Sequence, residues 1–252
     1  MAIGYRANGG VDFGINSLTP TIDPSQVTGD MMILIAGGKP FDLGWSVGAA
    51  GWTALGSGAS GSTAAGVDIG SMKFQVWYKV ATTDTEANPT LTEGTPAFNI
   101  VGCSLHIFSK GAGEVWGTPV VVYGADETDG TALSFTFASD PGVTAGDHIL
   151  CGVAVNTDAI GPLTANLTPA QTGVTFGATT ERNEGETTSG GDMSFHSTDT
   201  PVTSGTGSAA PTATGTGTAS GGDIDRAEAA FIRLRVSTPT GSPSFIVITA
   251  GV

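Results

Sequence analysis

The chain has few charged residues, few cysteines and no long apolar run, and each scarcity excludes a class of protein. Charged residues make up 13% of its 252 residues, about half the roughly 25% of an ordinary soluble domain. With 9 Lys and Arg and a net charge of −14, the chain has no basic stripe to neutralise nucleic-acid phosphates. The same charge disfavours anionic membrane surfaces. We therefore expect neither nucleic acid nor a membrane among its partners.

Short apolar runs and scarce cysteine exclude further classes. No apolar run approaches the length of a membrane span, and residues 1–10 lack a basic-then-apolar signal sequence. We therefore expect a soluble protein made in a cytosol. Cys103 and Cys151 each lie inside an apolar strand pattern, which favours two buried free thiols over a disulfide or half a metal site.

Helix-breaking residues and alternating apolar residues are what the chain has in abundance. It contains 39 Gly and 13 Pro, and no segment shows helical spacing at any length. Residues 72–80 alternate clearly, which predicts a strand with Met72, Phe74, Val76, Tyr78 and Val80 on one face. In residues 98–108, even-numbered positions from Ile100 to Phe108 should form one face and the apolar odd-numbered positions the other. The sequence predicts an all-β fold.

One segment occurs twice, which predicts an internal duplication. Residues 23–36 and 140–154 each contain an Asp-Pro turn, a few polar residues, a Gly-Asp step and an apolar run. Two further pairs of segments match: residues 51–53 with 173–175, and 70–75 with 191–196. The three separations are 117, 122 and 121 residues, so the spacing is nearly constant, as expected for repeated units.

The duplication leads to a specific architecture. We predict two sequence-related antiparallel β-sandwich lobes of jelly-roll type, residues 1–118 and 119–252; one large sandwich built from both halves is the alternative. Within this scheme, residues 56–66 form a Gly/Ser/Ala loop and residues 110–130 a connector. Residues 133–137 take the part of residues 11–15, and the low-complexity residues 212–218 form a strand of small residues.

Two motifs that suggest catalysis or nucleotide binding lack the context that these chemistries need. Residues 44–48, Gly-Trp-Ser-Val-Gly, match the nucleophile elbow of hydrolases, which requires a strand-to-helix turn beneath the serine, Ser46. Residues 56–61 match a dinucleotide fingerprint, which requires a helix N-terminus. Because no helix is predicted, we interpret the first as a chance match and the second as a turn-rich loop.

Metal chemistry is equally weakly indicated. His106, His148 and His196 lie on three separate predicted strands, without a close pair of ligands. His148 and His196 could approach each other, but we expect sheet histidines on polar faces. Residues 126–130 and 223–225 resemble fragments of calcium loops without the full ligand series, so structural calcium is a minor alternative. We assign no catalytic, cofactor-binding or metal-binding residues.

The aromatic residues permit a second kind of site. Trp45, Trp52, Trp77 and Trp116, with two tyrosines, could form a sugar-binding platform. We favour the interpretation that Trp52 and Tyr78 are core residues, while Trp45 and Trp116 lie in loops that cap the fold or contact a neighbour.

Several of these segments together resemble a known family. They are residues 27–30 (Val-Thr-Gly-Asp), 51–53 (Gly-Trp-Thr), 76–81 (Val-Trp-Tyr-Lys-Val-Ala), 146–147 (Gly-Asp) and 227–235. The chain resembles the repeat-containing β-sandwich proteins found in tailed-phage virion modules and in some bacterial surface proteins. In the second copy Val174 replaces the aromatic residue, which suggests different packing there.

The resemblance implies a function without catalysis. It implies a phage virion structural protein, with capsid decoration or cement as the first choice and a tail-fibre or tail-tip module that binds a receptor or carbohydrate as the alternative. The expected partners are virion subunits and further copies of the chain, and the expected location is the virion. No cofactor is implied.

Overall fold

The computed structural model describes residues 3–15, 17–39, 44–60, 72–93, 100–128, 132–157, 167–187, 193–216 and 224–239. These residues form β-strands, turns and loops, without a helix in the ranges described. Accordingly, no described segment is a helix long and apolar enough to cross a membrane. The all-β prediction is confirmed.

The first half of the chain builds one large and one small antiparallel sheet. The large sheet has the order β1-β8-β3-β6-β5 and the small sheet the order β2-β7-β4. The strands are β1 (Gly4–Gly14), β2 (Ser17–Leu18), β3 (Met31–Gly38), β4 (Trp45–Val47), β5 (Thr53–Ser60), β6 (Met72–Val80), β7 (Leu91–Glu93) and β8 (Val101–Ser109).

The second half repeats this strand order. Its large sheet is β10-β18-β12-β16-β14, with β15 also paired to β16, and its small sheet is β11-β17-β13. The strands are β10 (Val120–Asp126), β11 (Ala132–Thr136), β12 (His148–Thr157), β13 (Thr168–Ala170), β14 (Val174–Phe176), β15 (Thr180–Thr187), β16 (Met193–Gly205), β17 (Thr212–Thr216) and β18 (Ile224–Leu234). Each half therefore has the strand distribution of a jelly roll.

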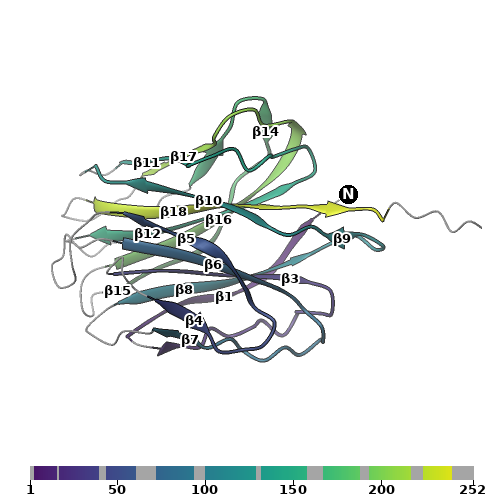
Figure 1. Ribbon diagram of the computed structural model, residues 1–252, viewed down its shortest axis with the longest axis horizontal. Helices are drawn as coiled ribbons and strands as arrows, with labels where there is room; N and C mark the ends of the chain where they lie inside the picture. Colours follow the sequence, from purple (N-terminus) through teal and green to yellow (C-terminus); the bar gives the residue numbers. More distant parts are fainter. Residues whose placement is uncertain are drawn as a thin grey trace, which may run out of the picture.

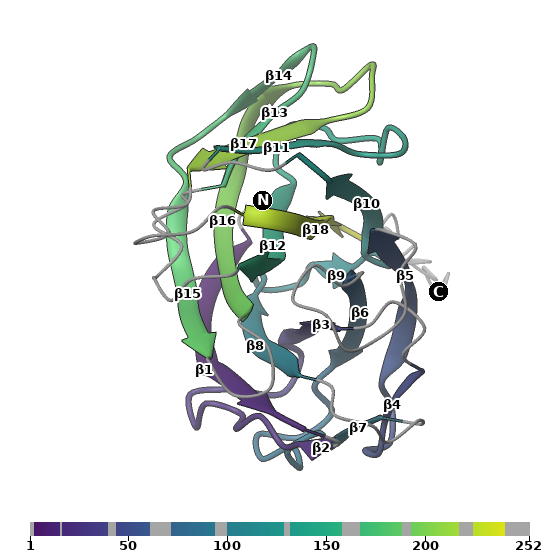
Figure 2. The same ribbon diagram turned by 90° about the vertical axis from the view of Figure 1, so that its left-hand side faces the viewer.

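The two halves stack into four layers, with the large sheets inside and the small sheets outside (Figures 1 and 2). Between β8 and β10, the short strand β9 (Val115–Trp116) pairs with β19 (Val236–Ser237) from the end of the described chain, so backbone hydrogen bonds also join the halves. The division into lobes at residue 118 stays a prediction, because the two large sheets also form a sandwich with each other.

Three apolar cores separate the four layers. The first outer core lies between the sheets of the first half, and the second outer core between those of the second half. A middle core joins the two large sheets and contains side chains from both halves. Its buried members are Met31, Ile33, Ile35, Met72, Phe74, Val76, Ile100, Phe108, Leu150, Ala154, Met193, Phe195, Ala230, Ile232 and Leu234.

Corresponding residues of the two copies meet in the middle core. The rings of Phe74 and Phe195 stack with centroids 5.8 Å apart and planes 11° apart. A Cβ atom on Gly37 would lie 2.3 Å from Cβ of Ala154, its counterpart 117 residues later. At the edges of the large sheets, β1 contacts β15 and β10 contacts β5 (Figure 2). Because β10 corresponds to β1 and β15 to β5, these two contacts are equivalent. Such contact of like with like is the mark of a two-fold interface.

The repeated Gly-Asp step forms the same turn in both halves. Asp30 and Asp147 each accept a hydrogen bond from the backbone N–H three residues earlier, at 2.9 Å and 2.8 Å. The preceding glycines have φ of 89° and 90°, a conformation that favours glycine. Asp30 also pairs with Arg6 and Asp147 with Arg235. The sequence repeat thus reflects a repeated structure.

The predicted alternation of two strands is confirmed. The even-numbered side chains of β6 from Met72 to Tyr78 lie in or against the middle core, while Trp77 lies in the first outer core. In β8 the odd-numbered positions from Val101 to Ile107 belong to the first outer core. Cys103 and Cys151 are free and buried, as expected. Burial raises the pKa of Cys151 to about 12.

One predicted correspondence between the halves is wrong. Residues 110–130, expected to be a connector, contain β10, which takes the place of β1 at the edge of the large sheet. Residues 133–137, expected there instead, lie largely in β11 of the small sheet. The consecutive valines of β10 show no alternation of apolar and polar residues, because Val121 packs against the middle core and Val122 in the second outer core. A strand covered on both faces has no polar alternation.

The small-residue segments are strands more often than expected. Residues 56–60 belong to β5 rather than to a loop, and residues 61–66 of that predicted loop lie outside the described residues. Small residues are needed here, because a Cβ on Gly58 would lie 2.6 Å from Cβ of Tyr123. The predicted strand at residues 212–218 is confirmed as far as Thr216.

Candidate functional site

The polar side chains gather on the two faces of the β15–β16 strand pair. The register of this pair shows one extra residue in β15 at Arg182, a bulge. A bulge reverses the sheet face on which the following side chains lie. Arg182 and Asn183 therefore both point between the two large sheets, where they contact Asp199 and Ser104. Glu181 and Glu184 instead share the outer face with His196. One irregularity therefore positions two groups of polar residues.

The inner group, called the interface network, consists of Tyr5, Ser104, His106, His148, Arg182, Asn183 and Asp199. On the first-half side, the Tyr5 hydroxyl lies 2.9 Å from Nδ1 of His106, and the Ser104 hydroxyl lies 3.1 Å from Nε2. Asn183 of the second half donates a hydrogen bond to the Ser104 hydroxyl. Both ring nitrogens of His106 are therefore satisfied, although the side chain is fully buried.

The second-half side of the interface network centres on Asp199. Its carboxylate accepts hydrogen bonds from Nε2 of His148 and from Nε of Arg182. The guanidinium carbon of Arg182 also lies 3.9 Å from the centre of the Tyr5 ring, close enough for a cation–π contact. Arg182 thereby connects the two sides of the network across the sandwich.

The electrostatics of the interface network do not suit acid–base catalysis. The pKa of His106 is lowered to about 3, mainly by burial; Asp199 opposes this effect and Arg182 adds to it. Burial would by itself raise the pKa of Asp199, but hydrogen bonds from His148 and Arg182 outweigh it and lower the pKa below the ordinary value. An efficient general base has a pKa near the working pH, so a neutral, enclosed His106 is a structural group.

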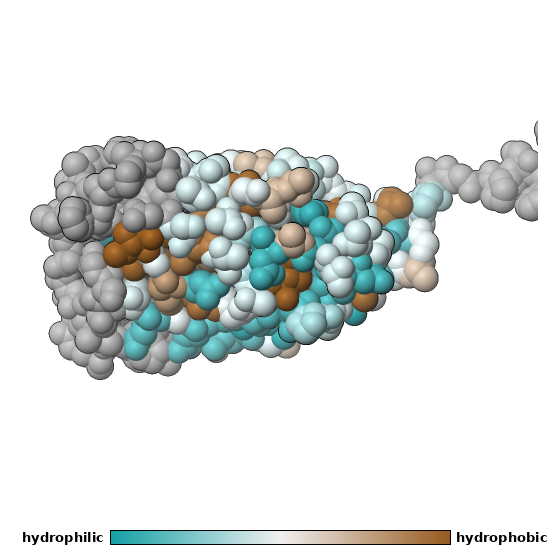
Figure 3. Space-filling view, turned by 90° about the horizontal axis from the view of Figure 1, so that it is seen from below, coloured by the Kyte–Doolittle hydropathy of each residue, from teal (hydrophilic) through white to brown (hydrophobic). Residues whose placement is uncertain are grey.

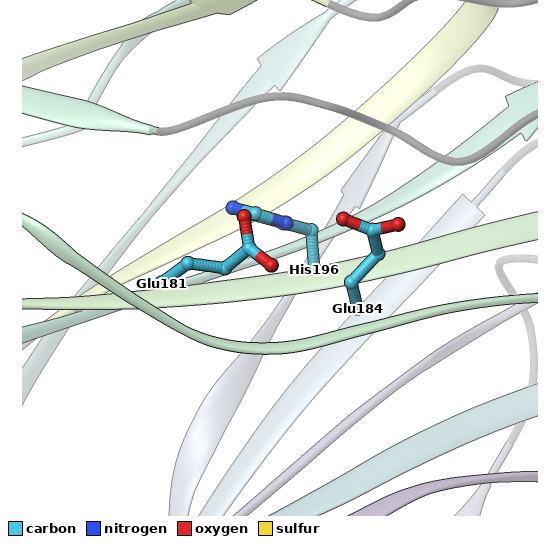
Figure 4. Close-up of side chains that lie close together, drawn as sticks. All are labelled: Glu181, Glu184 and His196. Atoms are coloured by element: carbon cyan, nitrogen blue, oxygen red, sulfur yellow. The ribbon is translucent and has the colours of Figure 1, made fainter.

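The outer group, called the outer triad, consists of Glu181, Glu184 and His196. One possible ligand atom of each residue lies within 4.8 Å of the others. Both carboxylates are exposed, whereas His196 is fully buried. Figure 4 shows the edge-on imidazole ring between the two carboxylates, which extend from the neighbouring strand. These residue types in this arrangement are those that bind divalent metal ions.

The histidines were predicted on polar faces of the sheets. His106 and His148 do contact polar side chains there, but all three histidines are enclosed. His106, His148 and His196 have exposed fractions of 0%, 5% and 0%. The strands that carry the histidines are packed against other strands and layers, whereas exposed residues of the second large sheet occur on the edge strand β15. His148 and His196 do not approach each other, because His148 points toward the interface network and His196 toward the opposite face of the sheet.

Ser46 of the hydrolase-like motif lies in a different structure from a nucleophile elbow. It is an exposed residue in the middle of β4, a three-residue edge strand paired antiparallel to β7. Within the described residues no helix follows it, and the histidines lie on the large sheets. A nucleophile elbow requires a strained turn from a strand into a helix, and β4 does not provide one.

The tryptophans do not form an exposed platform. Trp45 was expected in a loop but is a buried residue of β4, 6.5 Å from Trp77 between ring centres in the first outer core. Trp52 packs against the same core. Trp116 packs against the middle core and donates a hydrogen bond of 2.8 Å from Nε1 to the carbonyl of Gly29. Trp45, Trp52 and Trp77 thus contribute to the first outer core, and Trp116, also expected in a loop, lies in β9 against the middle core.

The calcium-loop fragments have a structural role where they are described. Asp126 is buried, and its carboxylate accepts backbone hydrogen bonds from Thr128 at 3.0 Å and Ser134 at 2.7 Å. Asp126 thus holds a turn at the end of β10 and bonds to the backbone of β11. Asp129, Gly130 and Asp223 lie outside the described residues.

Two hollows in the described surface contain little that could do chemistry. One, of about 510 Å³, lies over the small sheet β11-β17-β13 and is lined by small neutral residues such as Ser134 and Thr214. The other, of about 190 Å³, includes Asp23, Asp84 and Glu86, whose carboxylates accept hydrogen bonds from nearby turns. Neither hollow contains a histidine or a residue of the interface network.

Sequence reasoning missed the outer triad and most of the interface network. In a regular strand Glu181 and Glu184, three residues apart, would face opposite sides, so their spacing gives no signal of a shared site. The only available signal was Ser104 and His106 at a spacing of two, which places both on one face.

Comparison of the chain with protein-family models, with curated proteins and with solved structures found no match.

Proposed function

We propose that the chain is a non-enzymatic structural protein of a tailed-phage virion, with capsid decoration or cement as its role. The proposal starts from the resemblance of its repeated Gly-Asp and Gly-Trp-Thr segments to virion β-sandwich proteins. It is supported by the four-layer construction, in which two jelly rolls share a middle core. A part of this kind is stiff, because its sheets are packed on both sides.

The observation that carries the proposal is the position of the chemically capable side chains. His106, His148, Asp199 and Ser104 lie between the two large sheets, each no more than 5% exposed. Ser104 bonds to His106 within the first half and His148 to Asp199 within the second, while Asn183 of the second half donates a hydrogen bond to Ser104 of the first. A catalytic group must touch its substrate, so this arrangement supports a binding or assembly role over a hydrolytic one.

The surface suits a protein that must stay separate until it meets its partner. The net charge of −14 opposes self-association in solution. On the face shown in Figure 3, apolar residues form small separate groups among polar ones. The free edges of the small sheets are short, with β2 and β4 at two and three residues, and short edges resist uncontrolled strand pairing. Loops and side chains would then make the contacts with neighbouring subunits.

The alternative, a tail-tip module that binds carbohydrate, was based on exposed tryptophan rings, and the structure does not expose them. Trp45 is 7% exposed, and the indole N–H of Trp116 is bonded to Gly29. A glycan platform needs exposed aromatic faces. We expect glycan binding to be absent, and a glycan array probed with the intact chain and with Trp116→Ala checks this.

Cryo-electron microscopy of the phage particles that carry this chain tests the proposed function. Four-layer density on the capsid lattice is the expected result. Density at the tail tip would contradict capsid decoration and support the tail-tip alternative. Complete absence of the chain from purified particles would overturn both.

A further inference from the structure

We propose that Glu181, Glu184 and His196 bind a divalent transition-metal ion of the zinc class at the β15–β16 edge of the second half. The site is separate from the interface network and does not depend on the virion role. Two exposed carboxylates lead inward to one buried imidazole, so an ion would reach His196 from solvent through the glutamates (Figure 4).

The first argument is that His196 has unused hydrogen-bonding groups. Its side chain is fully buried, yet neither Nδ1 nor Nε2 has a hydrogen-bond partner among the described residues. A buried polar group without a partner is costly, and most such groups in folded proteins are satisfied. His106, equally buried, has both nitrogens bonded. A metal ion would satisfy one nitrogen of His196.

The second argument comes from the internal duplication. The bulge in β15 has a counterpart in β5, where the register also gains one residue between Ala54 and Ser57. By strand register, the residues of the first half that correspond to Glu181, Glu184 and His196 are Ala54, Ser57 and Gln75. The shared fold therefore needs the bulge, but it does not need two glutamates and a histidine.

The third argument is the arrangement of negative charge. Glu181, Glu184 and Glu186 lie on one strand, β15, and Glu184 and Glu186 pair with His196 and Ser194 on the neighbouring strand. A bound cation would relieve the repulsion among these carboxylates, since opposite charge favours the ionised form.

The ligand set favours zinc-class ions over calcium and magnesium. Zinc accepts imidazole nitrogen and carboxylate oxygen together, and three protein ligands leave a fourth position for solvent, whereas calcium and magnesium prefer oxygen ligands alone. Ligand atoms around a tetrahedral zinc ion, each about 2.0–2.2 Å from it, lie about 3.3 Å apart. Rotation of the exposed glutamate side chains can close the 4.8 Å spread to this value.

Isothermal titration calorimetry of the chelator-treated full chain with ZnCl₂ tests the site. We expect saturable binding of one ion per chain, with weaker binding of Mg²⁺ and Ca²⁺. The double variant Glu181→Gln/Glu184→Gln, which leaves the core intact, should weaken zinc binding at least about tenfold. Glu186→Gln, the matched control on the same strand face, should change it less than threefold.

The three histidines provide an internal control by NMR. Zinc should shift the ring resonances of His196 and leave those of His106 and His148 in place. The proposal is overturned if zinc does not saturate, if the double variant binds as the parent does, or if Glu186→Gln weakens binding as much as the double variant. The last result would mean diffuse attraction to an acidic surface. His196→Gln serves as a further test where it folds.

Discussion

At the scale of single residues, Glu228 is a buried carboxyl group whose hydrogen bonding is incomplete. It lies in β18 with 2% exposure, and its Oε2 has no hydrogen-bond partner among the described residues. Burial raises its pKa to about 8 from 4.5, with Glu127 adding to the rise. The folded chain therefore binds a proton here that the unfolded chain has already released, over the range between these two values.

This leads to a prediction for Glu228→Gln. Between pH 4.5 and about 8 the folded state holds the extra proton, so the free energy of unfolding falls as the pH rises. A glutamine cannot ionise. We expect the variant to be more stable than the parent at pH 8 by several kcal/mol, since each unit of pKa shift corresponds to about 1.4 kcal/mol, and equal to it near pH 4.5, as measured by urea unfolding. An equal difference at both pH values would contradict this.

His106 has the opposite pH dependence. Its pKa is lowered from 6.5 to about 3, so it is neutral in both states above pH 6.5. As the pH falls below 6.5 the unfolded state gains a proton and the folded state does not, so stability is lost until the pH approaches 3. The residues of the second half that correspond by register to Ser104 and His106 are Ala230 and Ile232.

The variant Ser104→Ala/His106→Ile copies those second-half residues into the first half. We expect the loss of stability between pH 6.5 and pH 4.5 to be smaller than in the parent, by up to about 1.4 kcal/mol per pH unit. His196, whose lowered pKa acts in the same direction, retains part of the slope. Urea unfolding at a series of pH values measures it, and a slope unchanged from the parent would rule out a neutral His106 in the fold.

At the scale of strands, small residues mark places where two sheet edges approach. A Cβ on Gly58 in β5 would lie 2.0 Å from Oε1 of Glu228 in β18, and 2.6 Å and 2.8 Å from Cβ and Cγ of Tyr123 in β10. Gly44, just before β4, has no atom within 4 Å of the same position. These two glycines therefore separate the effect of a close contact from the general effect of replacing glycine by alanine.

We expect Gly58→Ala to lower the free energy of unfolding by about 1–3 kcal/mol, because the new methyl group displaces the Glu228 carboxylate and forces β5 away from Tyr123 in β10. Gly44→Ala should change it by less than about 0.5 kcal/mol. Guanidinium unfolding of both variants provides the comparison. Equal effects of the two substitutions would show that the edges of the large sheets are not in close contact.

Strands were predictable from sequence to the extent that their side chains alternate. β6 and β8 separate two different cores, so their face pattern is visible in the sequence. β10 escaped prediction because its valines are apolar on both faces, and β5 because glycine and serine are typical of loops. The outer triad was not predictable, because Glu181 and Glu184 share a face only through the bulge at Arg182.

At the scale of the whole molecule, the duplication was readable but its consequence was not. Constant spacing between repeats shows that there are two copies, and it gives no information on which faces of the copies meet. The structure contains both predicted alternatives, a sandwich within each half and a further sandwich between the halves. The middle core is what makes one stiff body from two jelly rolls, and the proposed role in a virion depends on that stiffness.

A double-mutant cycle between Gly37 and Ala154 tests this shared core most directly. These corresponding residues face each other, and a Cβ added to Gly37 would lie 2.3 Å from Cβ of Ala154. Gly37→Ala should destabilise the chain, and adding Ala154→Gly should restore most of the loss, with a coupling of about 1–3 kcal/mol in urea unfolding. Contact of the new methyl group with Phe74 at 3.0 Å keeps the rescue incomplete. Losses that simply add, within about 0.5 kcal/mol, would contradict a two-fold core shared by the halves.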